Sequence, residues 1–136
     1  MHKNFTCDVK VYYEDTDAGG VVYYANYLKY LERARTEALE VIGLSNLKIK
    51  NEIGALIIVK SCKIEYRKSA GLEDKLNIKS FIKLTSKTSI LMNQDIFKGD
   101  EIIVEAQIHL VFVNENGRPT KIPSSIIDKF KPYISN

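Results

Sequence analysis

Four stretches of this chain alternate apolar and polar side chains and a fifth, residues 55–66, is strand-like, and these stretches constrain the fold more than any other feature. In residues 5–13, Phe5, Cys7 and Val9 fall on one side of an extended chain, and the polar residues between them fall on the other. A period of two is that of a β-strand with one buried face. The pattern predicts strands at residues 5–13, 55–66, 74–85, 88–97 and 101–113.

One long helix is predicted between the first strand and the other four. From about residue 22 to 42, apolar residues recur at spacings of three and four, and Gly43 stands where a helix commonly ends. Residues 44–54 look irregular, and a short C-terminal helix is predicted at about 124–133. We therefore expect a single α+β domain over residues 1–136, with one long helix against a five-stranded antiparallel sheet.

A sheet covered in this way is expected to need a partner. One helix covers only one face of a five-stranded sheet, so the other face and the sheet edges remain open. We therefore expect a homo-oligomer.

Composition excludes several classes of protein. The net charge of +3 is too small for the basic stripe of a nucleic-acid-binding protein. The longest aliphatic run, residues 55–59, is far short of the ~20 residues of a membrane-spanning helix. Residues 1–6 lack the apolar stretch of a secretion signal. We expect a cytoplasmic protein that binds no nucleic acid and does not span a membrane.

The cysteines and histidines do not suggest a metal site. Cys7 and Cys62 both fall in predicted strands and are interpreted as reduced core thiols. No cysteine or histidine has a neighbour at metal-ligand spacing, so no metal is expected. His2 is terminal, and His109 is interpreted as part of a polar sheet face.

The loop before the long helix carries the most chemical information. Asp17 and the Gly19–Gly20 pair directly precede the predicted helix start. Backbone N–H groups at such a start are unpaired, so those of Val22, Tyr23 or Tyr24 could stabilise an oxyanion while Asp17 acts as base or nucleophile. The alternative is that Asp17 only caps the helix or forms an Asx-turn.

A thioester is a bond that one carboxylate and a few backbone amides could hydrolyse. Its leaving thiol has a pKa of about 8.5 and departs as a thiolate. An amide would need a strong general acid at its leaving nitrogen, and the sequence offers no obvious one.

The same segment resembles a known family. The strings Tyr-Glu-Asp-Thr-Asp-Ala-Gly-Gly-Val-Val-Tyr at 13–23, Ala-Asn-Tyr-Leu at 25–28 and Glu-Arg-Ala-Arg-Thr-Glu at 32–37 look like the 4-hydroxybenzoyl-CoA thioesterase family, closest to its YbgC-type branch. The order of strands fits the same family to about Ile126. Two positions depart from the family: Tyr24 stands where many members of the branch carry His, and Ser69 where the family often has Pro.

The resemblance implies a fold and an activity. The fold would be a hot-dog, with active sites at the interface of a homodimer that commonly pairs into a homotetramer. The reaction would be hydrolysis of an acyl-CoA, or of an acyl carrier protein thioester, without a metal or bound cofactor; coenzyme A would enter only as part of the substrate. The catalytic carboxylate falls on Asp17, and the carbonyl-polarising amide on Tyr24.

Residues that meet the substrate are predicted less directly. Coenzyme A carries phosphates, so basic and hydroxyl side chains must meet it. Tyr23, Tyr27 and Ile57 are candidates for an acyl pocket. The candidates for contact with substrate or coenzyme A are Val22, Tyr23, Lys60, Ser86, Lys87, Thr88 and Ser89, with Lys63, Arg67 and Lys68 as further basic candidates.

Other functions stay open at this point. Glu32 on the helix could be the catalyst, or it could be a buried residue paired with Arg35 or with a neighbouring subunit. The domain could be a non-catalytic module that binds acyl-CoA or an acyl carrier protein, or one that serves as an interaction subunit. A hot-dog dehydratase would need a histidine in its site, and neither His2 nor His109 is placed for that role.

Overall fold

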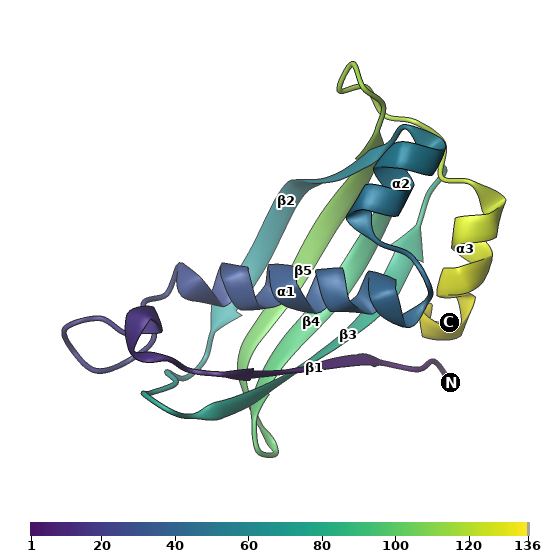
Figure 1. The fold of residues 1–136 in the computed structure, drawn as a ribbon. Coiled ribbons are helices and arrows are strands. Elements are labelled where there is room, and N and C mark those ends of the chain that lie inside the picture. Colours follow the sequence, from purple (N-terminus) through teal and green to yellow (C-terminus); the bar gives the residue numbers. More distant parts are fainter. Residues whose placement is uncertain (136) are drawn as a thin grey trace.

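The computed structural model describes residues 1–135 as a layer of helices packed on one sheet (Figure 1). Short 3₁₀ turns occupy Tyr13–Asp15 and Lys131–Tyr133. The main elements are β1 (Phe5–Lys10), α1 (Asn26–Val41), α2 (Asn46–Ile53), β2 (Leu56–Tyr66), β3 (Lys75–Thr85), β4 (Ser89–Lys98), β5 (Glu101–Val113) and α3 (Ser124–Phe130).

The sheet is antiparallel throughout and has the strand order β1-β3-β4-β5-β2. Tight connections join β3 to β4 and β4 to β5, while β1 and β2 form the two edges. The expected fold class, one long helix on a five-stranded antiparallel sheet, is confirmed. In Figure 1, α1 crosses one face of the sheet, and its first turn lies at the same end of the molecule as the loop that follows β1.

The core lies between α1 and the face of the sheet that α1 covers. Tyr30 and Leu31 from α1 are fully buried, as are Ile78, Ile96 and Phe112 from the strands. Alternate residues of β3, β4 and β5 point to this side, which is the physical basis of the period-two pattern. Burial at these positions fixes the strand register, because a shift of one residue would turn every apolar side chain outward.

The first strand and the long helix are both shorter than predicted. β1 ends at Lys10, because the partner segment turns away: the Asp74 N–H donates to Gly71 O at 3.1 Å, and Glu73 has a φ of 65°. The 3₁₀ turn that follows is closed by the Asp15 carboxylate, which accepts the Tyr12 N–H at 2.9 Å. The helix begins at Asn26 rather than near residue 22, because Val22 pairs in a β-bridge with Thr16.

The prediction that residues 44–54 are irregular is wrong, because they contain α2. Ser45 accepts the Lys48 N–H at 3.0 Å as its N-cap, and Gly54 ends the helix with φ of 73°. The predicted C-terminal helix is confirmed as α3, with the 3₁₀ turn completing it.

The two cysteines are free thiols, but only one is close to the core. Cys7 is half-buried on β1, whereas Cys62 is exposed on β2. The expectation of two core thiols is therefore wrong for Cys62, because β2 is an edge strand and this position on it is exposed. Within residues 1–135, no helix combines the length and apolar character needed to cross a membrane.

Candidate active site

The loop between the 3₁₀ turn and α1 folds back on itself as a tight hairpin. Thr16 bridges to Val22, and the Asp17 N–H donates to Val21 O at 2.9 Å. The Gly20 N–H donates to Asp17 O at 3.0 Å, and its φ of 81° lies in the left-handed region that favours glycine. Asp17 therefore stands at the base of a rigid turn rather than in a loose linker.

The Asp17 side chain is exposed and engages its own turn. Its Oδ1 accepts the Gly19 N–H at 2.9 Å, which is the Asx-turn geometry considered above. Its Oδ2 has no hydrogen-bond partner within residues 1–135. The larger cavities of the single chain lie elsewhere.

The N–H groups at the start of the helix are not equivalent. Val22 donates to Ala70 O at 2.8 Å, and Tyr23 donates to Asp15 O at 2.9 Å. The expectation that either amide could serve an oxyanion is wrong, because each is already bound. The N–H groups of Tyr24 and Ala25 have no acceptor in the described chain, as expected of the first residues of a helix.

One backbone carbonyl ties the hairpin to the helix start. Asp15 O accepts both the Tyr23 N–H and the Asn26 side-chain amide, each at 2.9 Å. Asp15 itself is buried. Beneath it, burial and the nearby Asp15 carboxylate raise the pKa of Tyr30, whose buried hydroxyl has no hydrogen-bond partner among residues 1–135. The tie fixes the position of Tyr24, which lies two residues before the first residue of α1, relative to the loop.

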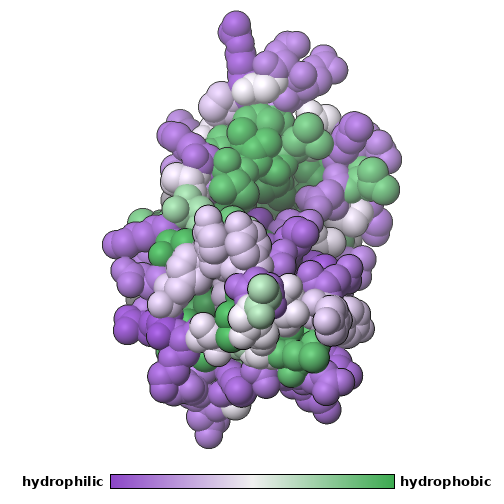
Figure 2. Space-filling model, turned by 90° about the vertical axis from the view of Figure 1, so that its left-hand side faces the viewer, coloured by the Kyte–Doolittle hydropathy of each residue, from purple (hydrophilic) through white to green (hydrophobic). Residues whose placement is uncertain are grey.

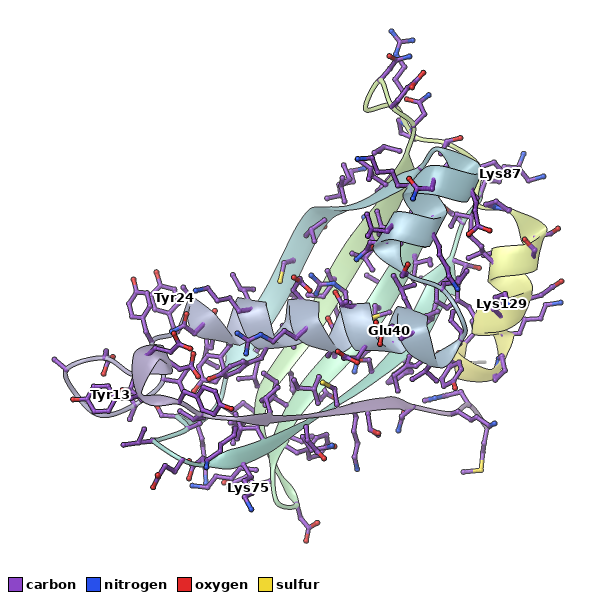
Figure 3. The ribbon with its side chains drawn as sticks, viewed as in Figure 1. Tyr13, Tyr24, Glu40, Lys75, Lys87 and Lys129 are labelled. Atoms are coloured by element: carbon purple, nitrogen blue, oxygen red, sulfur yellow. The ribbon has the colours of Figure 1, made fainter. Side chains whose placement is uncertain are left out.

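The Tyr24 side chain lies among other aromatic rings. The Tyr24 ring meets Tyr66 edge-on at 5.9 Å between centroids and lies 5.1 Å from the Tyr23 ring. Tyr66 is the last residue of the edge strand β2, and all three rings are exposed. Figure 3 shows Tyr24 at the end of the molecule where α1 starts. Tyr27 differs from them, because it is buried and its hydroxyl accepts the Ala70 N–H at 3.0 Å.

A cavity of about 190 Å³ lies between the middle of α1 and the sheet. Ile57, a candidate for the acyl pocket, lines it; Tyr23 and Tyr27 do not. The walls are mostly apolar, with Arg35 and Glu32 as the charged exceptions. Glu32 is exposed and accepts the Thr36 hydroxyl at 2.7 Å, so it is neither buried nor paired with Arg35.

The residues predicted to meet coenzyme A form a separate group. Lys60, Thr88 and Ser89 line one groove of about 220 Å³ together with His109. Ser86 and Ser89 share a hydroxyl hydrogen bond of 2.6 Å in the adjoining turn. Figure 3 places Lys87 at the opposite end of the molecule from Tyr24. A single chain therefore does not bring these residues to the Asp17 loop.

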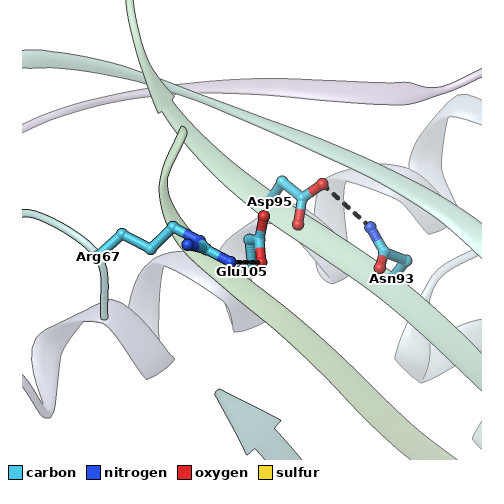
Figure 4. Close-up of polar contacts among 4 residues, drawn as sticks. All are labelled: Arg67, Asn93, Asp95 and Glu105. Atoms are coloured by element: carbon cyan, nitrogen blue, oxygen red, sulfur yellow. Dashed lines mark hydrogen bonds and ion pairs between the residues drawn. The ribbon is translucent and has the colours of Figure 1, made fainter. Parts of the chain in front are cut away.

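Two other basic candidates are already paired. Arg67 contacts Glu105 at 2.9 Å, and Lys68 contacts Glu101 at 2.6 Å. Figure 4 shows the Arg67–Glu105 pair beside Asp95, which accepts the Asn93 side-chain amide at 3.2 Å. Burial raises the pKa of Asp95, and Glu105 adds to the effect. This polar row lies on the sheet face away from α1.

Comparisons with known proteins agree with one another. Residues 11–130 match the family model described as the thioesterase-like superfamily. The acyl-CoA thioester hydrolase YbgC of Escherichia coli O157:H7 is 39% identical over 129 residues, covering 93% of this chain and 96% of the relative. The acyl-CoA thioesterase YbgC of Helicobacter pylori is 37% identical, with 93% and 96% covered. Among solved structures, a probable thioesterase from Bartonella henselae has a TM-score of 0.85 at 30% identity, over 88% of this chain and 99% of that one.

Proposed function

The chain belongs to the thioesterase-like superfamily of hot-dog proteins, and we propose that it hydrolyses acyl-CoA thioesters with Asp17 as catalytic carboxylate and the Tyr24 amide as oxyanion donor. The resemblance found in the sequence is confirmed, and the chain is a thioesterase. The relatives from Escherichia coli and Helicobacter pylori carry acyl-CoA in their names, which supports acyl-CoA as the substrate class.

The proposed roles rest on a difference in hydrogen bonding among the three backbone amides that precede the helix. Of the three predicted donors, only Tyr24 lacks an acceptor within residues 1–135, and it follows the Asp17 hairpin directly. A free N–H here stabilises the negative charge that develops on the thioester oxygen. Because the donor is backbone, it is independent of the side chain, so Tyr24 in place of His leaves it intact.

The reaction needs few groups. In the general-base route, Asp17 takes a proton from water as the water oxygen bonds to the carbonyl carbon. The tetrahedral intermediate then collapses, the C–S bond breaks, and coenzyme A leaves as a thiolate that takes up the proton. In the nucleophilic route, the carboxylate forms an acyl anhydride that water hydrolyses to the same products.

We further propose that the site is completed by a second copy of the chain at β2. This edge strand is eleven residues long, and its exposed apolar side chains include Leu56, Ile58 and Val59. A long apolar edge is a template for pairing with another strand. Figure 2 shows hydrophobic surface gathered on the side of the molecule that carries the β2 edge and the Asp17 loop. Pairing there would cover the exposed Asp17 and the tyrosines beside it.

Replacement of Asp17 by Asn tests the function. The variant keeps the Gly19 N–H acceptor but cannot take a proton or attack a carbonyl, so we expect it to fold, bind acyl-CoA and lose roughly 10²- to 10⁴-fold in kcat. Thiol release from short, long and aromatic acyl-CoAs measures turnover, and calorimetry measures binding. Glu14→Gln, in the same exposed segment, is the matched control and should retain activity.

Two results would contradict the proposal. Wild-type turnover in Asp17→Asn would remove Asp17 from the mechanism. Binding of every acyl-CoA by the wild-type protein without any thiol release would make the domain a binding module instead.

A further inference from the structure

We infer that the cavity beneath α1 receives the far end of the acyl group, and that Arg35 in its wall selects acyl groups that end in a carboxylate. This inference rests on the proposed thioesterase function and adds the substrate class. It concerns side chains on the middle of the helix, away from the Asp17 loop.

The cavity has a suitable size and lining. Its volume of about 190 Å³ exceeds that of apolar protein cavities that hold a benzene ring, ~150 Å³. Leu39, Met92 and Leu110 are among its apolar walls, so it favours hydrocarbon. Arg35 is the one cation in this lining.

Most of the hydrogen-bond donors of Arg35 are unused within residues 1–135. Its Nη1 donates to Gln94 Oε1 at 2.9 Å, which is its only hydrogen bond to the described residues. Gln94 is fully buried and cannot turn, because its amide nitrogen donates to Leu31 O and Ser80 Oγ, both at 3.1 Å. A guanidinium carries five N–H donors, so most of those on Arg35 remain unused.

Arg35 also forms no ion pair with the described residues. No carboxylate among residues 1–135 lies within 4.0 Å of it, and the adjacent Glu32 is engaged by Thr36 instead. Burial lowers the pKa of Arg35, although Glu32 and Cys62 oppose this effect. A partly buried cation without an ion-pair partner is costly, and a carboxylate would relieve that cost through bidentate, charge-assisted hydrogen bonds.

The exposed edge strand β2 runs from the start of α1 to this cavity. Tyr66 contacts Tyr24 at one end of β2, and Val59 lines the cavity nearer the other end. Cys62 is exposed between them. An acyl chain with its carbonyl at the Tyr24 amide can therefore extend along α1 toward Arg35.

The distance sets the acyl length. Tyr24 and Arg35 are eleven residues apart, about 16 Å along a helix, and the arginine side chain reaches back toward the N-terminus. An extended chain gains about 1.2 Å per bond, so roughly ten bonds separate the two groups. We expect the preferred substrate to be a dicarboxylic monoacyl-CoA of about this length.

Paired substrates test the inference on the wild-type protein. For each chain length from short to long, kcat/KM is measured for the ω-carboxyl acyl-CoA and for the plain acyl-CoA of the same length. We expect the ω-carboxyl member to be favoured roughly tenfold or more near the predicted length and not among the shortest pairs. Arg35→Met should lower the ratio of kcat/KM between the ω-carboxyl and the plain member of each pair by roughly 10- to 100-fold near the predicted length. Arg35→Lys should retain part of the preference.

The outcomes separate this inference from the proposed function. Equal kcat/KM for both members of every pair overturns the role of Arg35 while thioesterase activity stands. If no thioester is hydrolysed, the proposed function fails, and calorimetric binding of the same pairs to Asp17→Asn then decides the role of Arg35. If Arg35→Met does not fold, the wild-type ratios and Arg35→Lys decide it. A second copy that fills the Arg35 site would abolish the preference in the wild type, which also overturns the inference.

Discussion

Gly19 lies close enough to the Asp17 carboxylate to control its position. A Cβ atom built on Gly19 would stand 3.3 Å from Asp17 Oδ1, tighter than nearly all such contacts, and the backbone at Gly19 has no left-handed φ. Gly19→Ala should therefore displace the carboxylate without straining the chain. We expect kcat to fall roughly tenfold or more, since small misplacements of a catalytic group are costly, with little change in melting temperature.

Gly71→Ala is the control for that measurement. Its added Cβ would meet Gly20 O at 3.7 Å, an ordinary contact, in the segment packed against the same hairpin. If Gly19→Ala and Gly71→Ala have the same kcat, the Asp17 carboxylate is not held where Gly19 can disturb it.

Local sequence could identify Asp17 but not the free amide. A carboxylate beside a glycine pair before a helix is visible in the residue order. Which of the three amides stays free depends on Ala70 O and Asp15 O, which take the donors of Val22 and Tyr23. Ala70 lies almost fifty residues further along the chain, so no local pattern shows that it takes an amide at the helix start.

At the scale of elements, long periodic segments were predictable and their ends were not. β2, β3, β4 and β5 match their predicted ranges to within a residue or so. Burial alternates along β3, β4 and much of β5, whereas β2 was predicted from its aliphatic run. α1 starts late because a bridge with Thr16 holds Val22 in extended backbone. α2 was not predicted, because a helix of eight residues gives only a weak periodic signal. Its N-cap Ser45 and C-cap Gly54 are residue types typical of helix ends.

The tie between the hairpin and α1 predicts an effect of Asn26 on catalysis. Asn26→Ala removes the side-chain donor to Asp15 O, while the Tyr23 N–H still binds that carbonyl. We expect a stability loss of about 1 kcal/mol by urea denaturation, the typical contribution of one hydrogen bond. We also expect a lower kcat with a nearly unchanged KM for a given acyl-CoA, because the Tyr24 amide loses its fixed position. If kcat is unchanged and the stability loss is as stated, the tie is purely structural.

At the scale of the whole molecule, the sequence predicted that the sheet needs a partner but not where. An open edge follows from the number of strands and helices alone. Which strand forms the edge depends on strand order. β2 is an edge strand because it pairs with β5, the last strand, and not with β3, the next strand in sequence. The same order places Tyr66 beside Tyr24, so the exposed edge and the candidate site became neighbours only through long-range pairing.

The position of that edge predicts that assembly and activity fail together. Ile58 is exposed on β2, and a lysine there puts a charge into the proposed strand pair. Burying an unpaired charge costs at least about 2 kcal/mol, so the dimer dissociation constant should rise more than roughly tenfold. Sedimentation or light scattering over a dilution series should show dimers or larger assemblies for the wild type and a shift to monomer for Ile58→Lys, with kcat/KM falling in parallel. Leu84→Lys, which charges an exposed leucine on β3 instead, should leave the assembly state and kcat/KM unchanged.

A monomeric Ile58→Lys protein with full activity would mean that a single chain forms the complete site. An unaltered Ile58→Lys dimer would place the subunit contact away from β2.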